Sequence, residues 1–217
     1  MTAALRVNDS ESYTTAFHFL VRDEPMVFKS RMSRERFHKF VLSLPDLRIE
    51  RDSLGTVTIY PSMTFDSGFI EGEVFRCFAN WSSAHRNLGR AFSPSTSFDM
   101  PDGAEYKADG SWVSMEKINS LTPEERKHIA AIVPDFIIEV RSETDRISRL
   151  KKRMTDGWLA NGVRLAWLID PIKERAWVYR SDQDIPEEFS NFNTVLTGEE
   201  VLPGFELRLA ELKNQTI

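Results

Sequence analysis

The sequence predicts an α/β fold in which a mixed β-sheet is flanked by helices. Residues 136–140 and 165–169 are two short apolar runs, broken only by Glu139, as in strands buried on both faces. Segments with apolar residues at helical spacing precede and separate these runs. Hydrophobic residues make up 41% of the chain and charged residues 28%, which is typical of a globular protein. Strands that alternate with helices in this way are characteristic of the α/β class.

The length of 217 residues suffices for one domain with a buried core. We expect an N-terminal arm over residues 1–30, where periodicity is weak, and a single domain over residues 31–217. No apolar run reaches the ~18 residues that span a bilayer, and the N-terminus lacks the blocks of a signal peptide. The single cysteine, Cys77, excludes a Cys-based zinc site and fits a reducing compartment. We therefore expect a cytoplasmic protein without a membrane partner.

The first part of the domain predicts a helix followed by a hairpin. Ser33 is a candidate N-cap for a helix that ends before Pro45. Residues 47–51 and 56–60 alternate like two strands, and Gly55 supplies the turn between them.

The middle of the chain predicts a long helix, three strands and a short helix. Residues 68–85 carry apolar side chains about four apart, as in a helix. Thr122 and Glu125 form a capping box that starts a short helix, which ends before Pro134. The strands are expected at residues 90–93, 96–100 and 106–114.

The last part predicts one more helix and several strands. Residues 142–145 cap a helix that runs to Asn161, and Gly162 ends it. The remaining strands are expected at residues 165–169, 175–179, 193–196 and 205–209.

Two acidic residues lie within predicted strands, where acids are unfavourable. Asp109 falls in the strand over residues 106–114, and Glu139 falls in the strand over residues 136–140. A buried unpaired carboxylate is costly, and a divalent cation would supply the missing charge. Mg²⁺ binds one or two carboxylates together with water and substrate phosphate, and it would polarise a scissile phosphodiester. We expect both side chains to converge if they share a face of the sheet.

A run of basic residues follows the Glu139 strand on the predicted helix. Only one or two of these residues can face a site on the sheet, because a helical turn covers about four residues. Taken singly, each strand acid is explained by a salt bridge and the basic run by a solvated helix face. The combination favours a site for a metal and a phosphate. The basic residues are Arg146, Arg149, Lys151, Lys152 and Arg153.

A series of short motifs also occurs in a characteristic order between residues 37 and 209. Together they resemble the PD-(D/E)xK nuclease superfamily and, within it, a bacterial putative restriction endonuclease family. The resemblance implies a restriction-endonuclease-like mixed sheet flanked by helices. The motifs cover residues 44–51, 54–55, 60–61, 95–98, 101–104, 108–113, 134–142, 161–163, 167–171 and 203–207.

The resemblance also implies roles for the two acids. Asp109 matches the first metal-binding aspartate, although Ala108 stands where this family usually has proline. Glu139 matches the acid of the (D/E)xK element, and the backbone carbonyl of Val140 would complete the coordination of the metal. Glu73, on the earlier helix, is a candidate accessory acid, for which a solvated helix position is the simpler interpretation.

The motif lysine is absent from the strand, where its position is taken by Arg141. The resemblance implies that the lysine has moved to the following helix, at the position of Arg153 or just before it. We choose Lys152 as the catalytic cation, with Lys151 and Arg153 as the alternatives. Arginine at this position would weaken the case for catalysis, because it stays protonated and cannot act as a base.

The expected function is that of a Mg²⁺- or Mn²⁺-dependent DNA endonuclease, in which Asp109 and Glu139 bind the metal. DNA is the expected partner, and a homodimer is expected by analogy, because cutting both strands needs two sites. The alternative is a catalytically degenerate nuclease fold that serves as a binding or assembly module. The missing strand lysine and the net charge of −5 favour this alternative.

Other site classes lack their motifs. The sequence has neither the Gly-x-Ser-x-Gly of a serine hydrolase nor a Gly-x-x-x-x-Gly-Lys-Ser/Thr phosphate loop. Asp135 is expected to turn the chain into the following strand. The four histidines, which lack metal-ligand spacing, are His18, His38, His85 and His128.

Overall fold

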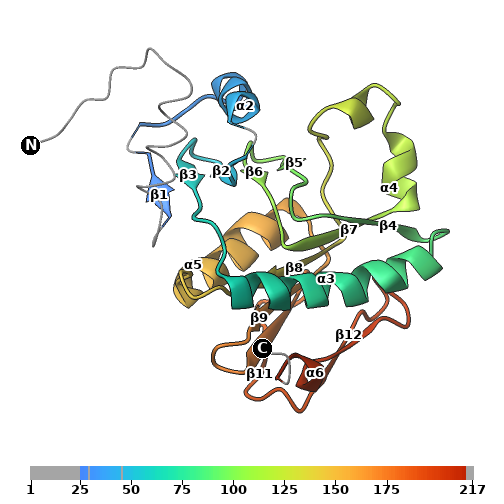
Figure 1. The fold of residues 1–217 in the computed structure, drawn as a ribbon. Coiled ribbons are helices and arrows are strands. Elements are labelled where there is room, and N and C mark those ends of the chain that lie inside the picture. The colour runs from blue at the N-terminus through green and yellow to red at the C-terminus, as the bar shows by residue number, and fades with distance from the viewer. Residues whose placement is uncertain (1–24, 29, 45, 214–217) are drawn as a thin grey trace, which may run out of the picture.

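The larger of two main sheets forms the centre of the fold (Figure 1). The structure is a computed structural model that describes residues 25–28, 30–44 and 46–213. The larger sheet has the strand order β11-β10-β9-β8-β7-β4, in which β8 and β9 are parallel and the other neighbours antiparallel. A mixed sheet is therefore confirmed. Its strands are β4 (Gly89–Phe92), β7 (Gly110–Ser114), β8 (Phe136–Val140), β9 (Leu165–Asp170), β10 (Arg175–Arg180) and β11 (Glu187–Phe189).

The smaller sheet has the strand order β1-β3-β2-β6-β5, and helix α2 (Arg34–Ser43) packs on it. The predicted N-cap is confirmed, since the Ser33 side chain accepts a hydrogen bond from the Arg36 backbone N–H. The predicted hairpin is also confirmed, and Gly55 takes the φ of +85° that its turn requires. The strands are β1 (Met26–Val27), β2 (Ile49–Arg51), β3 (Val57–Ile59), β5 (Phe98–Asp99) and β6 (Glu105–Tyr106).

The predicted N-terminal arm, residues 1–30, lies mostly outside the described residues. The described part contains β1, which pairs with β3 and so extends the smaller sheet.

Helix α3 (Phe65–Ala84) crosses one face of the larger sheet (Figure 1). It begins three residues before the predicted start, because Thr64 caps it. Its Phe78 packs against Phe136 of β8 and against Phe205. The same core takes in the C-terminal elements, which are β12 (Val195–Thr197), β13 (Glu206–Arg208) and α6 (Ala210–Lys213).

A second helical layer covers the opposite face of the larger sheet. The predicted helix is present, but it changes type along its length: α5 (Ile147–Lys152) continues as π-helix η2 (Arg153–Trp158) and ends in 3₁₀-helix η3 (Leu159–Asn161). Buried Met154 and Trp158 join the core on this face. Gly162 ends the segment with a φ of +101°, as predicted.

Two predicted elements differ from the structure. The single strand expected over residues 106–114 is two strands, because the chain leaves the smaller sheet after β6 and enters the larger sheet at β7. The helix expected after Thr122 is only a 3₁₀ turn, η1 (Glu125–Lys127), since residues 122–128 are all exposed and bury no apolar face. A short helix, α4 (Met115–Ser120), instead follows β7 directly and is capped by Ser114.

Within the described residues, no helix combines the length and the apolar character required to cross a lipid bilayer.

Candidate active site

The pairing of β7 with β8 brings Asp109 and Glu139 together. Gly110 lies opposite Ile138, so one more residue of this antiparallel register places Asp109 opposite Glu139. At this position a side-chain hydrogen bond connects the two segments, because Asp109 Oδ2 accepts a 2.7 Å hydrogen bond from the Val140 N–H. Both acids are buried, with 5% and 2% of their surface exposed. The prediction that both acids lie in neighbouring segments is therefore confirmed, although Asp109 precedes β7 instead of lying within it.

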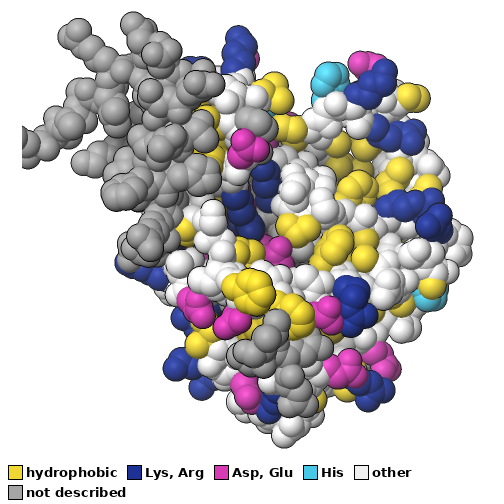
Figure 2. Space-filling model, viewed as in Figure 1, with side chains coloured by type: hydrophobic (Ala, Val, Ile, Leu, Met, Phe, Trp, Pro, Cys, Tyr) yellow, Lys and Arg dark blue, Asp and Glu magenta, His cyan; other side chains and the backbone are white. Residues whose placement is uncertain are grey.

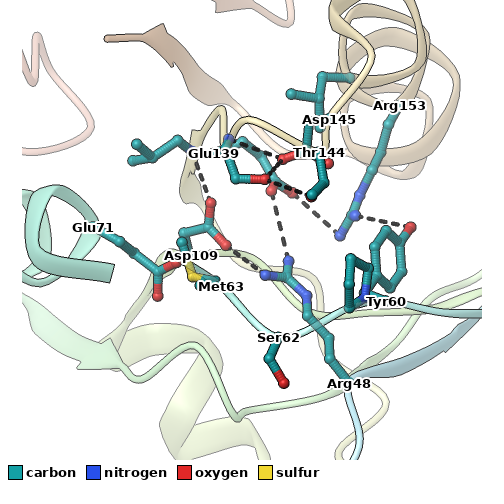
Figure 3. A pocket seen from close by; sticks show the side chains of 14 residues that line it. Arg48, Tyr60, Ser62, Met63, Glu71, Asp109, Glu139, Thr144, Asp145 and Arg153 are labelled. Carbon is teal, nitrogen blue, oxygen red and sulfur yellow. Dashed lines mark hydrogen bonds and ion pairs between the residues drawn. The ribbon is translucent and has the colours of Figure 1, made fainter. Parts of the chain in front are cut away.

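Two arginines pair with these acids (Figure 3). Arg48, just before β2, places Nη1 2.8 Å from Asp109 Oδ1 and Nη2 3.8 Å from Glu139 Oε2. Arg153 places Nη2 3.2 Å from Glu139 Oε1 and Nη1 2.9 Å from Glu50 Oε2. Burial disfavours the charged form of both guanidinium groups, but the surrounding carboxylates raise the pKa of each above its usual value. Both arginines therefore stay cationic.

The π-helix orients two groups toward Glu139. Arg153 begins η2 and Trp158 ends it, and both reach Glu139 Oε1, with the Trp158 indole N–H donating at 2.9 Å. In an α-helix, residues five apart face different directions, because the repeat is 3.6 residues. The wider i→i+5 turn places them on the same side of the helix.

Lys152, the predicted catalytic cation, does not lie beside the acids. Its side chain is 77% exposed, and its Nζ lies 3.8 Å from Asp156 Oδ2. Lys151 is also directed elsewhere, with Nζ 4.0 Å from the centroid of the Trp177 ring. Of the three candidates on this helix, Arg153 is the one that the structure brings to Glu139.

A pocket opens beside the acid pair, and Lys and Arg side chains gather in a hollow near the middle of the face shown in Figure 2. Elements of both main sheets, α3 and the segment that leads into α5 contribute to its walls. The lining residues are Arg48, Tyr60, Pro61, Ser62, Met63, Glu71, Asp109, Glu139, Val140, Ser142, Thr144, Asp145, Leu150 and Arg153.

Helix α3 contributes a third acid, Glu71, which lies next to Asp109 in the close view (Figure 3). Its Oε2 is buried and has no hydrogen-bond partner among the described residues. Burial, followed by repulsion from Asp109, raises the pKa of Glu71 to about 7. Glu73, the accessory acid considered from the sequence, instead pairs with Arg76 at 2.7 Å. The helix therefore presents an acid two residues before the one considered.

Glu139 also resists ionisation. Burial raises its pKa to about 8, although Arg153 and Arg48 act in the opposite direction. A cation that binds this carboxylate must therefore displace a proton at neutral pH.

The donor chemistry of the pocket fits a hard divalent cation. Asp109 and Glu139 offer carboxylate oxygens, which Mg²⁺ prefers, and Glu71 contributes a third carboxyl group to the lining of the pocket. Val140, the proposed carbonyl ligand, lines the pocket. The described residues hold no cluster of three or more His, Cys, Asp or Glu arranged for a metal. The arrangement therefore resembles the two-carboxylate sites in which water and substrate complete the coordination of Mg²⁺.

Two nearby polar residues have structural roles. Asp135 accepts a 2.8 Å hydrogen bond from the Ser114 N–H and pairs with Lys117 at 2.9 Å, so it connects the start of β8 to the end of β7 and to α4. Arg141, the residue at the position where the resemblance implied a lysine, pairs with buried Asp170 at 2.8 Å.

Comparisons with known proteins identify one family and one similar fold. The model of the Uma2 family, described as "Putative restriction endonuclease", matches residues 34–210. The crystal structure of a putative nuclease belonging to DUF820 from Anabaena variabilis ATCC 29413 is 22% identical and has a TM-score of 0.68, covering 84% of this chain and 97% of that chain. A cryoEM structure of a DrdV–DNA complex is 10% identical and has a TM-score of 0.35, covering 54% of this chain and 10% of that chain. No curated protein matched the sequence.

Proposed function

This chain belongs to the Uma2 family of putative restriction endonucleases, and we propose that it is a metal-dependent endonuclease that hydrolyses phosphodiester bonds in DNA. The family and the nuclease fold support a nuclease. The observation that carries the finer proposal is the meeting of Asp109 and Glu139 in a pocket that also holds two guanidinium groups. Carboxylates that bind a cation, next to fixed positive charges, suit a phosphodiester in its transition state.

Asp109 and Glu139 would hold Mg²⁺ or Mn²⁺, with the backbone carbonyl of Val140 as a further ligand. The bound ion would supply a Lewis acid for a phosphoryl oxygen and a bound water of lowered pKa. The chain itself holds Glu139 in place through the Trp158 N–H and Arg153. It holds Asp109 through the Val140 N–H.

Glu71 would accept the proton of the attacking water at its carboxylate, which lines the pocket. Its pKa of about 7 lies close to neutral pH, where a general base is most effective. In place of Lys152 we therefore assign proton transfer to Glu71 and charge stabilisation to Arg48 and Arg153, the two arginines of the pocket. An arginine can stabilise charge but cannot act as the base.

A specific observation favours the alternative of a non-catalytic binding module. No lysine lines the described pocket, and Arg48 and Arg153 already neutralise the two acids. A module of this kind would bind DNA or another partner without cutting it.

Cleavage of supercoiled plasmid DNA in Mg²⁺, in Mn²⁺ and in EDTA separates the two functions. We expect cleavage in the metals and none in EDTA. Asp109→Asn and Glu139→Gln should be folded and inactive, whereas Glu124→Gln, which alters a 71%-exposed acid paired with Lys127, should cleave like wild type. Intact plasmid under all three conditions would favour the binding module. A linear first product would support a homodimer, because both strands would be cut in one encounter.

A further inference from the structure

Arg48 bridges the two acids from the smaller sheet. Its guanidinium group lies 2.8 Å from Asp109 and 3.8 Å from Glu139, and its Nη2 also donates to the Lys107 carbonyl at 3.2 Å. These carboxylates are the oxygens that a divalent cation would use under the proposed function. Arg48 and the cation therefore share the same partners.

The two arginines of the pocket are held very differently. Arg153 is 9% exposed and is fixed by Glu50, by Glu139, by the Lys107 carbonyl and by the Tyr60 hydroxyl. Arg48 is 27% exposed, and its contact with Glu50 is a long one of 3.5 Å. Arg48 thus has access to the open pocket, whereas Arg153 is enclosed.

We propose that Arg48 competes with the divalent cation for Asp109 and Glu139 and, once displaced, binds the phosphate of the substrate. The inference rests on the proposed function. A guanidinium group and a divalent cation repel each other, so both cannot keep the same short contacts with the acids. The released guanidinium remains at the wall of the pocket, and its planar fork suits phosphate oxygens.

The competition predicts that one substitution changes two properties in opposite directions. Arg48→Met should bind Mn²⁺ about tenfold more tightly than wild type, since a unit positive charge beside the ligands is lost. It should also cleave plasmid at least about tenfold more slowly at saturating Mn²⁺, since a charge-assisted phosphate contact is lost. A merely structural role would weaken both metal binding and cleavage.

The experiment measures Mn²⁺ affinity from the electron paramagnetic resonance signal of free Mn²⁺, alongside cleavage rates. Arg48→Lys keeps the charge without the fork, so it should bind Mn²⁺ as weakly as wild type and cleave more slowly. Should Arg48→Met fail to fold by circular dichroism, Arg48→Lys still tests the phosphate contact and Arg48→Gln tests the competition. Arg175→Met, which removes a 51%-exposed charge, should match wild type in both assays.

Each remaining outcome overturns a defined part of the proposal. Unchanged or weaker Mn²⁺ binding by folded Arg48→Met would overturn the competition. Tighter Mn²⁺ binding with unchanged cleavage would overturn the phosphate contact. Absence of Mn²⁺ binding in wild type and in Arg48→Met alike would overturn the proposed function and this inference with it.

Discussion

Replacement of Arg153 by methionine tests whether the buried charges of the site stabilise the fold. The substitution removes the guanidinium that pairs with Glu50 at 2.9 Å and with Glu139 at 3.2 Å, and both acids are only 2% exposed. Removal of one partner from a buried ion pair costs about 3–5 kcal/mol, because the remaining polar groups stay buried without their hydrogen-bond donors and counter-charge. Arg48 remains nearby, so we expect a loss of about 3 kcal/mol at pH 7. Urea denaturation should show a lower midpoint at an unchanged slope.

The loss of stability caused by Arg153→Met should also depend on pH. Burial already raises the pKa of Glu139 to about 8, and removal of Arg153 would raise it further. A carboxyl group whose pKa is higher in the folded state than in the unfolded state loses stability as pH rises toward the folded value. Below about pH 8, the free energy of unfolding decreases with rising pH at the same rate in wild type and in the variant. Above it only the variant continues to lose stability, so its deficit should be larger at pH 9.5 than at pH 7.

A surface pair gives the matched control. Arg175→Met breaks the exposed contact with Glu188 and should cost less than about 1 kcal/mol. A double-mutant cycle of Arg153→Met with Glu139→Gln should give a coupling of about 0.5–3 kcal/mol. A deficit for Arg153→Met no larger than that of the control, or equal deficits at pH 7 and pH 9.5, would refute the reasoning.

Three further predictions follow from the same structure. Mn²⁺ affinity should rise between pH 6 and pH 8, because the pKa values of Glu71 and Glu139 are about 7 and 8 and both protons must leave before the metal binds. Equal Mn²⁺ affinities at pH 6 and pH 8 in a calorimetric titration would contradict this. Trp158→Phe removes the buried N–H that donates to Glu139 at 2.9 Å and should cost about 1–3 kcal/mol in urea denaturation, whereas wild-type stability would argue against that hydrogen bond. Gly89→Ala places a Cβ 2.3 Å from an indole ring of β7 and should cost about 1–3 kcal/mol by thermal denaturation. Gly72→Ala, at an open position of α3, should be stabilising by about 0.5–1 kcal/mol, and similar effects of the two alanines would be inconsistent with this packing.

The two acids could be predicted from the sequence because the signal is local. Glu139 interrupts an apolar strand, and a polar residue at such a position needs a compensating partner. The same holds for the helix ends, where Ser33 and Gly162 act as predicted. These features depend on neighbours in the sequence, which periodicity and capping preferences describe well.

The cations could not be predicted, because their positions depend on contacts distant in the sequence or on helix type. Arg48 and Asp109 are 61 positions apart, and no spacing rule connects them. The choice of Lys152 over Arg153 rested on the inability of arginine to act as a base, whereas the structure leaves Lys152 exposed and directs Arg153 to Glu139. Glu71 was missed for a related reason, since apolar spacing alone did not distinguish which acid of α3 faces the pocket.

The passage of the chain from the smaller sheet to the larger sheet was not predicted. The pair Asp109-Gly110, a common turn dipeptide, lies at the crossing but was interpreted as part of one continuous strand over residues 106–114. The crossing matters because Asp109 lies at the entry to the larger sheet and thereby comes within reach of Arg48.

Because of this crossing, the acids of the site come from a different part of the fold than Arg48 and the residue that anchors Arg153. Glu139 lies in the larger sheet and Asp109 directly precedes its strand β7, whereas Glu50, which anchors Arg153, lies in the smaller sheet and Arg48 directly precedes its strand β2. Local melting of the smaller sheet would therefore leave the acid pair intact but strip away its nearest counter-charge. The electrostatics of the candidate site therefore depend on the folding of the smaller sheet, in which neither of its two acids lies.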